Sequence, residues 1–113
     1  MEIITVEIIP GIMPKPKCYA SQHDNGRQIQ LDLKENGEIF TLTGTEDLTL
    51  RVRKNNGEEI TESVTNEGGN HVIIRITRDM TSEFGEMLCE LGIETPTRRI
   101  GSANFILKVE RAV

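Results

Sequence analysis

Alternation of apolar and polar residues with a period of two is the feature that most constrains the fold of this chain. In the segment 27–34, Ile29, Leu31 and Leu33 alternate with polar residues, as in a strand with one buried face and one solvated face. The same alternation recurs in four further rows of apolar residues: Leu48, Leu50 and Val52; Val72, Ile74 and Ile76; Met87, Cys89, Leu91 and Ile93; Phe105, Leu107 and Val109. Shorter candidate strands cover 39–42 and 60–64. The pattern predicts an all-β fold with these rows facing the core.

Turn sequences separate the alternating segments. Asn36-Gly37 and Asn56-Gly57 each lie between two extended runs and favour hairpins, because both residue types accept positive φ. Gly68-Gly69 and Thr95-Pro96 predict two further turns. Strands spaced in this way predict an immunoglobulin-like antiparallel β-sandwich. The chain contains no tryptophan, which excludes the Cys…Trp…Cys arrangement of antibody domains.

Two segments depart from the alternation. Asp79 is a good N-cap and Gly85 a good stop, so one short helical turn is predicted near Asp79–Phe84, between the two sheets. The segment 10–16 contains three of the four prolines and is expected to be extended or turning.

The length of 113 residues suits one domain. We expect a single sandwich over 1–113, made of an N-terminal strand at 2–9, a proline-containing loop at 10–26 and a body at 27–110. In the N-terminal strand Ile4, Val6 and Ile8 share one face, while Ile3 and Ile9 lie on the other. This strand is therefore either covered on both sides or presents one side to another subunit.

Charge and hydropathy exclude several classes of protein. The chain has 18 acidic and 13 basic residues and a net charge of −5, which argues against nucleic-acid binding. Its apolar runs are far shorter than the roughly 18 residues of a membrane helix. The N-terminus lacks the basic start and apolar run of a signal peptide, so synthesis and retention in a cytoplasm are expected.

The residues that could carry chemistry form no recognisable constellation. A hydrolytic triad on Ser21 or Ser82 would need His23 or His71 to be oriented by an acid, and no spacing favours this. A metal site of His23, Asp24 and Asp32 would combine a loop with a strand and matches no zinc or calcium motif. We therefore predict no catalytic, cofactor-binding or metal-binding residue.

Cys18 and Cys89 are too few and too far apart for a disulfide scaffold and are interpreted as free thiols. The alternation places Cys89 in the core, where it would pack as a small apolar residue. Cys18 is expected in a loop, but with no basic neighbour beyond Lys15 and Lys17 it is not predicted to be a reactive thiol.

Surface residues carry the remaining signal. Five apolar residues occupy positions that the alternation otherwise makes polar, and they are candidates for an interface: Ile3, Ile9, Ile73, Leu88 and Ile106. The basic residues Arg51, Arg53, Lys54, Arg98 and Arg99 are interpreted as solvated strand faces.

One set of turn and strand motifs resembles a known family. The segments 21–27, 35–44 and 48–57, followed by 80–94 and 99–110, are similar to the N-terminal domain of phage baseplate upper proteins and related phage minor structural and fibre proteins. The resemblance runs from about Ile4 to Glu110. Ser102-Ala103-Asn104 replaces the commoner threonine-containing approach to the last strand.

The resemblance implies a non-enzymatic docking or attachment module of a phage baseplate, tail or head fibre. Its partners would be phage structural proteins and further copies of itself, with a trimer as one option. It would lie in the virion after assembly in the host cytoplasm. A carbohydrate-binding module is the main alternative, opposed by an aromatic content of only 4%. A small hydrolase would need a catalytic constellation, and a bacterial adhesion domain would need an export signal.

Overall fold

A computed structural model describes residues 1–9 and 15–112 of the chain. All regular elements within these residues are strands: β1 (Glu2–Glu7), β2 (Lys17–Ser21), β3 (Arg27–Glu35), β4 (Glu38–Ile39), β5 (Asp47–Arg53), β6 (Glu59–Val64), β7 (His71–Ile76), β8 (Gly85–Thr95) and β9 (Arg98–Glu110). The predicted all-β fold is confirmed.

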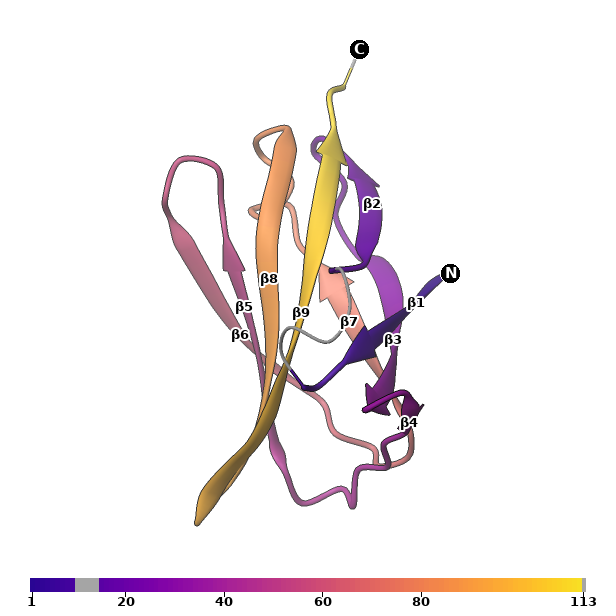
Figure 1. Cartoon of the computed structure of the whole chain (residues 1–113). Helices are drawn as coiled ribbons and strands as arrows, with labels where there is room; N and C mark the ends of the chain where they lie inside the picture. The colour runs from indigo at the N-terminus through magenta and orange to yellow at the C-terminus, as the bar shows by residue number, and fades with distance from the viewer. Residues whose placement is uncertain (10–14, 113) are drawn as a thin grey trace.

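The strands form two packed sheets (Figure 1). In the four-stranded sheet, β3 pairs with β1 on one side and with β4 and β7 on the other. The five-stranded sheet has the order β2-β9-β8-β5-β6. This arrangement confirms a β-sandwich, whereas the immunoglobulin-like strand order stays a prediction.

The sandwich was predicted to be antiparallel, and most strand pairs are, but each sheet also contains one parallel pair. β1 runs parallel to β3, and β2 runs parallel to β9. β1 and β2 follow each other in sequence but join opposite sheets, and β3 then returns to the sheet of β1. Two reversals of direction separate β1 from β3, so the two strands point the same way.

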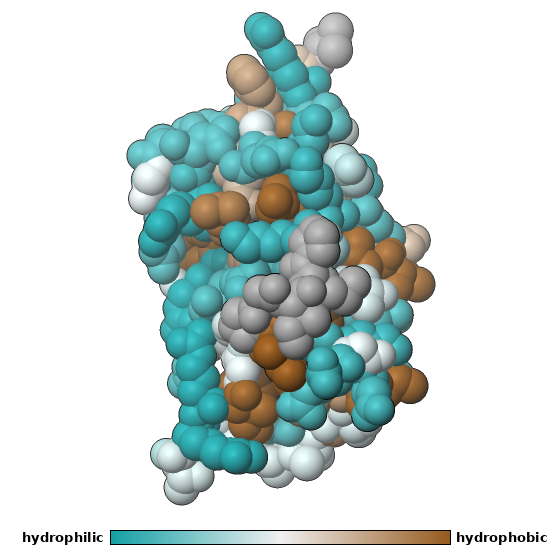
Figure 2. Space-filling model, in the orientation of Figure 1, coloured by the Kyte–Doolittle hydropathy of each residue, from teal (hydrophilic) through white to brown (hydrophobic). Residues whose placement is uncertain are grey.

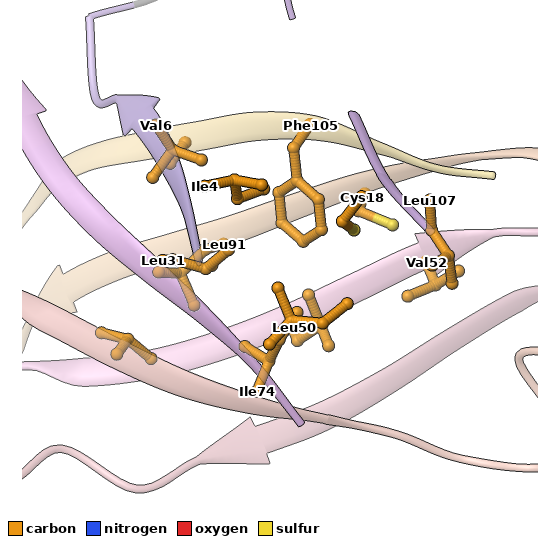
Figure 3. Packing of buried hydrophobic residues seen from close by; sticks show 14 of the residues in the cluster. Ile4, Val6, Cys18, Leu31, Leu50, Val52, Ile74, Leu91, Phe105 and Leu107 are labelled. Carbon is orange, nitrogen blue, oxygen red and sulfur yellow. The ribbon is translucent and has the colours of Figure 1, made fainter. Parts of the chain in front are cut away.

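The core consists of the predicted alternating rows. Every residue of the five rows is buried, and Phe105 and Leu31 are fully so. Side chains from both sheets point into one cluster, with Phe105 entering from β9 and Leu31 from β3 (Figure 3). The period of two thus correctly predicted which face of each long strand is buried.

β2 is a strand within the segment that was expected to be a loop. Its side chains alternate between buried Cys18 and Ala20 and exposed Lys17, Tyr19 and Ser21. The alternation is present in the sequence, but its inward residues are small and carry little apolar signal. Residues 10–14 of the predicted proline-containing segment lie outside the described residues.

β1 is an integral strand that presents one face to the core. Ile4 and Val6 are buried, whereas Ile3 is 57% exposed. Acidic side chains at the two ends of β1 hold neighbouring segments. The backbone N–H of Tyr19 donates to Glu2 at 3.0 Å, and a Glu7 oxygen accepts the N–H of Gly37 at 2.7 Å. These bonds fix β1 beside β2 and the β3–β4 turn.

The predicted helical turn is a single hydrogen-bonded turn, and no helix occurs between β7 and β8. The N–H of Thr81 donates to the carbonyl of Arg78 at 3.2 Å. The capping oxygen belongs to Thr77, which accepts the N–H of Met80 at 3.4 Å, and Asp79 instead contacts Lys54. The segment does connect the two sheets, as predicted, because β7 and β8 lie in different sheets.

The sequence suggested that Lys54 lies on a solvated strand face, and this interpretation is wrong. Its side chain is only 4% exposed, and its ammonium group donates to Ser82 at 2.8 Å and Asp79 at 3.3 Å. Lys54 follows the last residue of β5, where strand alternation no longer applies. The side chain therefore ties the β5–β6 turn to the β7–β8 connection.

Candidate protein–protein interface

The five predicted interface residues do not form one surface. Leu88 and Ile106 lie opposite each other on β8 and β9, on the outer face of the five-stranded sheet. Ile3 and Ile73 both lie opposite Gln30 and so share the outer face of the four-stranded sheet. Ile9 follows β1 and is 36% exposed. The sandwich places these two groups on opposite sides of the molecule.

The richer of the two faces is that of the five-stranded sheet. One row of this face contains Lys17, Ile106, Leu88 and Arg53, and it ends at Glu59 on β6. Leu88 is 49% exposed and Ile106 is half-buried. We call Lys17, Ile106, Leu88 and Arg53 the Leu88 row. It combines an apolar centre with two cations that are each paired to an acid, the composition expected of a small contact surface.

A shallow hollow of about 210 Å³ lies beside Leu88. It is lined by Lys15, Arg51, Arg53, Glu59, Leu88, Cys89, Glu90, Asn104 and Phe105. Cys89 and Phe105 point inward, so the exposed lining is formed by the outward residues of β5, β6, β8 and β9 together with Lys15. Sequence reasoning missed the hollow because it depends on which strands are neighbours.

Ion pairs order the charged side chains around the hollow. Glu90 accepts from Arg51 at 3.2 Å and from Arg99 at 3.0 Å, so one carboxylate holds two guanidinium groups. Arg53 and Glu59 are 3.8 Å apart. All these side chains are partly exposed, so each pair stabilises the fold only weakly. Their main effect is to hold the cations in place on this face.

A further ion pair lies at the β2 side of the same face. Lys17 donates to Glu86 at 2.9 Å, and this hydrogen bond lowers the pKa of Glu86 and raises that of Lys17. Tyr19, which is 46% exposed, lies one row away opposite Lys108. Lys17 and Tyr19 went unnoticed as surface candidates because β2 was taken for a loop.

The outer face of the four-stranded sheet is the weaker candidate for an interface. Its most exposed apolar strand residues are Ile39 on β4 and Ile3 on β1, and Gln30 separates Ile3 from half-buried Ile73. Figure 2 shows one side of the molecule, where apolar residues lie in separate areas among hydrophilic ones.

Both cysteines are buried free thiols. Burial raises the pKa of each to about 12, so neither is a thiolate near neutral pH. The expectation that Cys18 lies in a loop is wrong, because Cys18 is fully buried on β2. Cys89 packs in the core as predicted.

The groups considered for a metal or a triad have structural roles where contacts are seen. Asp24 accepts the N–H of Ser21 at 2.8 Å and the Arg27 guanidinium at 2.9 Å. The hydroxyl of Thr81 donates to the Asp24 carbonyl at 2.6 Å. Within 1–9 and 15–112, no three His, Cys, Asp or Glu side chains gather as metal ligands would.

The fold and this surface define a β-sandwich domain of two mixed sheets with a mixed apolar and charged sheet face. No family model matches the chain, and no curated protein sequence matches it. Among solved structures it is similar to the N-terminal domain of phage TP901-1 ORF48, with a TM-score of 0.73 and 17% identity. The match covers 96% of this chain and 97% of that one. The predicted resemblance to a phage protein domain is confirmed at the level of the fold.

None of the described segments is a helix with the length and hydropathy needed to cross a membrane.

Proposed function

We propose that this chain is a non-enzymatic structural protein of a phage or prophage, a single β-sandwich domain over 1–113 that assembles with other particle proteins. The observation that carries the proposal is the likeness of nearly the whole chain to a phage protein domain. The turn and strand motifs between 21 and 110 favour the same role. They favour a baseplate, tail or fibre as its place in the virion, after assembly in the host cytoplasm.

The Leu88 row is the best candidate for docking. Leu88 lies on the outer face of β8, the middle strand of the five-stranded sheet, between Ile106 and Arg53. A contact of this kind draws its affinity from the apolar centre and its orientation from the charged rim. The partner would be another structural protein of the particle, bound without nucleic acid, membrane, metal or cofactor.

The carbohydrate-binding alternative gains no support from this face. Tyr19 is its one aromatic side chain among the described strands, whereas sugar rings are commonly bound by stacking on aromatic platforms.

The proposal is tested by the protein content of purified particles. Wild-type virions should contain this protein, and Leu88→Glu should reduce its amount about tenfold or more, because a charge would enter the apolar centre of the contact. Quantitative immunoblots of gradient-purified particles measure this amount.

Ile3→Glu is the matched control, since Ile3 is similarly exposed on the opposite face. The Ile3→Glu protein should be incorporated normally. Absence of the wild-type protein from virions would refute the structural role. Equal incorporation of both variants would refute docking through the Leu88 row, but it would not refute the structural role.

A further inference from the structure

The two lateral edges of the sandwich differ. At one edge Glu2 of β1 accepts the N–H of Tyr19, so a side chain already occupies the free side of β2. At the other edge β6 and β7 contact each other across the two sheets. Within the described residues β6 pairs only with β5, and β7 only with β3. This second edge is therefore open to another strand.

The hydrogen bonds next to these strands show which backbone groups point outward. The carbonyl of Glu58 accepts the Lys54 N–H at 2.8 Å, so even-numbered residues of β6 face β5. The carbonyl of Asn70 accepts the Leu33 N–H at 2.9 Å, so even-numbered residues of β7 face β3. Because this direction alternates along an antiparallel strand, the odd-numbered residues of both strands direct their N–H and C=O groups away from their sheets.

The two open strands carry opposite charge. β6 contains Glu59 and Glu62 and no basic residue, whereas β7 contains Arg75 and His71 and no acid. Antiparallel pairing of like strands joins no opposite charges: β6 with β6 would place Glu59 opposite Ser63, and β7 with β7 would place Arg75 opposite His71. Pairing β6 of one copy with β7 of another instead places Glu59 opposite Arg75.

We propose that two copies of this chain associate through these edges, with β6 of each copy pairing antiparallel with β7 of the other. The odd-numbered residues fix the register, with Glu59 opposite Arg75, Thr61 opposite Ile73 and Ser63 opposite His71 of the second copy. All six side chains lie on outer sheet faces, so the side-chain parity of the joined sheets matches.

Two-fold symmetry closes this assembly. β6 and β7 lie at the same edge but in different sheets, and they run in opposite directions (Figure 1). A two-fold axis parallel to the strands therefore forms two identical β6–β7 pairs at once and continues each sheet of one copy into the other sheet of its neighbour. The contact is self-complementary and saturates at two copies.

Charge reversal with light scattering after size-exclusion chromatography tests the pairing. The wild type should reach twice the chain mass of 12.7 kDa at micromolar to millimolar concentration. Glu59→Arg and Arg75→Glu should each weaken the dimer about tenfold or more, because each places like charges opposite one another in both strand pairs.

Mixing the two variants is the decisive step. A heterodimer of Glu59→Arg with Arg75→Glu has opposite charges in both pairs, so mixing should restore the dimer and the double variant should dimerise alone. Arg98→Glu, at the exposed β8–β9 turn, is the matched control and should leave the mass unchanged. Thermal unfolding by circular dichroism checks that every variant is folded.

Three results would overturn the pairing: a wild type that is monomeric at about 1 mM, single variants that dimerise as well as the wild type, or a mixture that stays monomeric. If a reversal prevents folding, Glu59→Gln and Arg75→Gln replace it and should each weaken the dimer severalfold. Glu59 contacts Arg53 of the Leu88 row, but the mass of the wild type and of the Arg75 variants is measured without any change to that row. Failure here therefore leaves incorporation into virions, and the Leu88→Glu test, unaffected.

Discussion

Glu46 holds the loop that leads into β5 through a single carboxylate. It is only 7% exposed, and it accepts the backbone N–H groups of Thr43 and Gly44 and the side-chain amide of Asn66 at 3.0 to 3.1 Å. Burial raises the pKa of Glu46, but hydrogen bonds from Thr43 and Asn66 lower it more, to about 2. Sequence reasoning passed over Glu46 because its donors come from loops with no periodic pattern.

We expect Glu46→Gln to lower the free energy of unfolding by about 2 kcal/mol at pH 7, because a neutral amide accepts these bonds less strongly. The folded pKa lies below its ordinary value, so the stabilisation is full above about pH 4.5 and is lost as the pH falls toward 2. Urea unfolding of both proteins between pH 2 and pH 7 measures the difference.

Exposed Glu67→Gln, in the neighbouring loop, is the control and should change stability little. A gap between wild type and Glu46→Gln that stays constant from pH 7 to pH 2 would contradict the role of the charge.

At the scale of elements, the strands with bulky aliphatic rows were predictable, whereas β2 was taken for a loop. β3, β5 and β9 bury Ile, Leu, Val or Phe at every second position, so their period of two stands out. β2 buries only Cys18 and Ala20, so its sequence carries little apolar alternation. Its strand conformation is stabilised by pairing with β9. The turn between β7 and β8 was placed correctly, but its capping residue was not. Asp79 contacts the distant Lys54 instead of capping the turn, and Thr77 is the capping residue.

Gly85 shows how such a connection depends on a distant element. Its φ of +121° disfavours other residues, and a Cβ there would collide with the Asn55 side-chain nitrogen. We expect Gly85→Ala to destabilise the fold by about 2 to 4 kcal/mol, from the backbone conformation and the steric conflict together. Thermal or urea unfolding measures this loss.

Gly57→Ala separates the two causes, because Gly57 also has positive φ, +89°, but no atom within 4 Å of an added Cβ. The Gly57→Ala variant should lose less stability than the Gly85→Ala variant. Adding Asn55→Ala to Gly85→Ala should recover part of the loss. If the double variant lost more stability than the two single variants lose together, the steric conflict between a Cβ at position 85 and Asn55 would be disproved.

At the scale of the whole molecule, the sequence determined which residues face inward but not which strands are neighbours. Parity placed Leu88, Ile106, Ile3 and Ile73 outside the core and left their mutual distances open. Sheet order then divided them between opposite faces. The hollow beside Leu88 and the edge formed by β6 and β7 were equally beyond prediction, because both arise from pairings between distant segments.

The continuous core makes one charge decisive for the entire fold. Leu50, which is 2% exposed, points inward from β5, while its neighbour Thr49 points outward. Leu50→Asp should destabilise the protein by about 3 to 5 kcal/mol, because an unpaired charge would be buried. Thr49→Asp should remain folded. Circular dichroism melts compare the two, and similar behaviour would contradict the assigned parity.

The parallel pairing of β2 with β9 has a mechanical consequence. Lys17 lies beside Ile106 and Ser21 beside Glu110, so tension applied at residue 17 and beyond residue 110 pulls the two strands lengthwise in opposite directions. Their hydrogen bonds then carry the load together, in shear, and must yield almost simultaneously. In the antiparallel β8–β9 hairpin, a pull on its two open ends would instead separate the bonds one by one. Under tension, β2 therefore resists the detachment of β9.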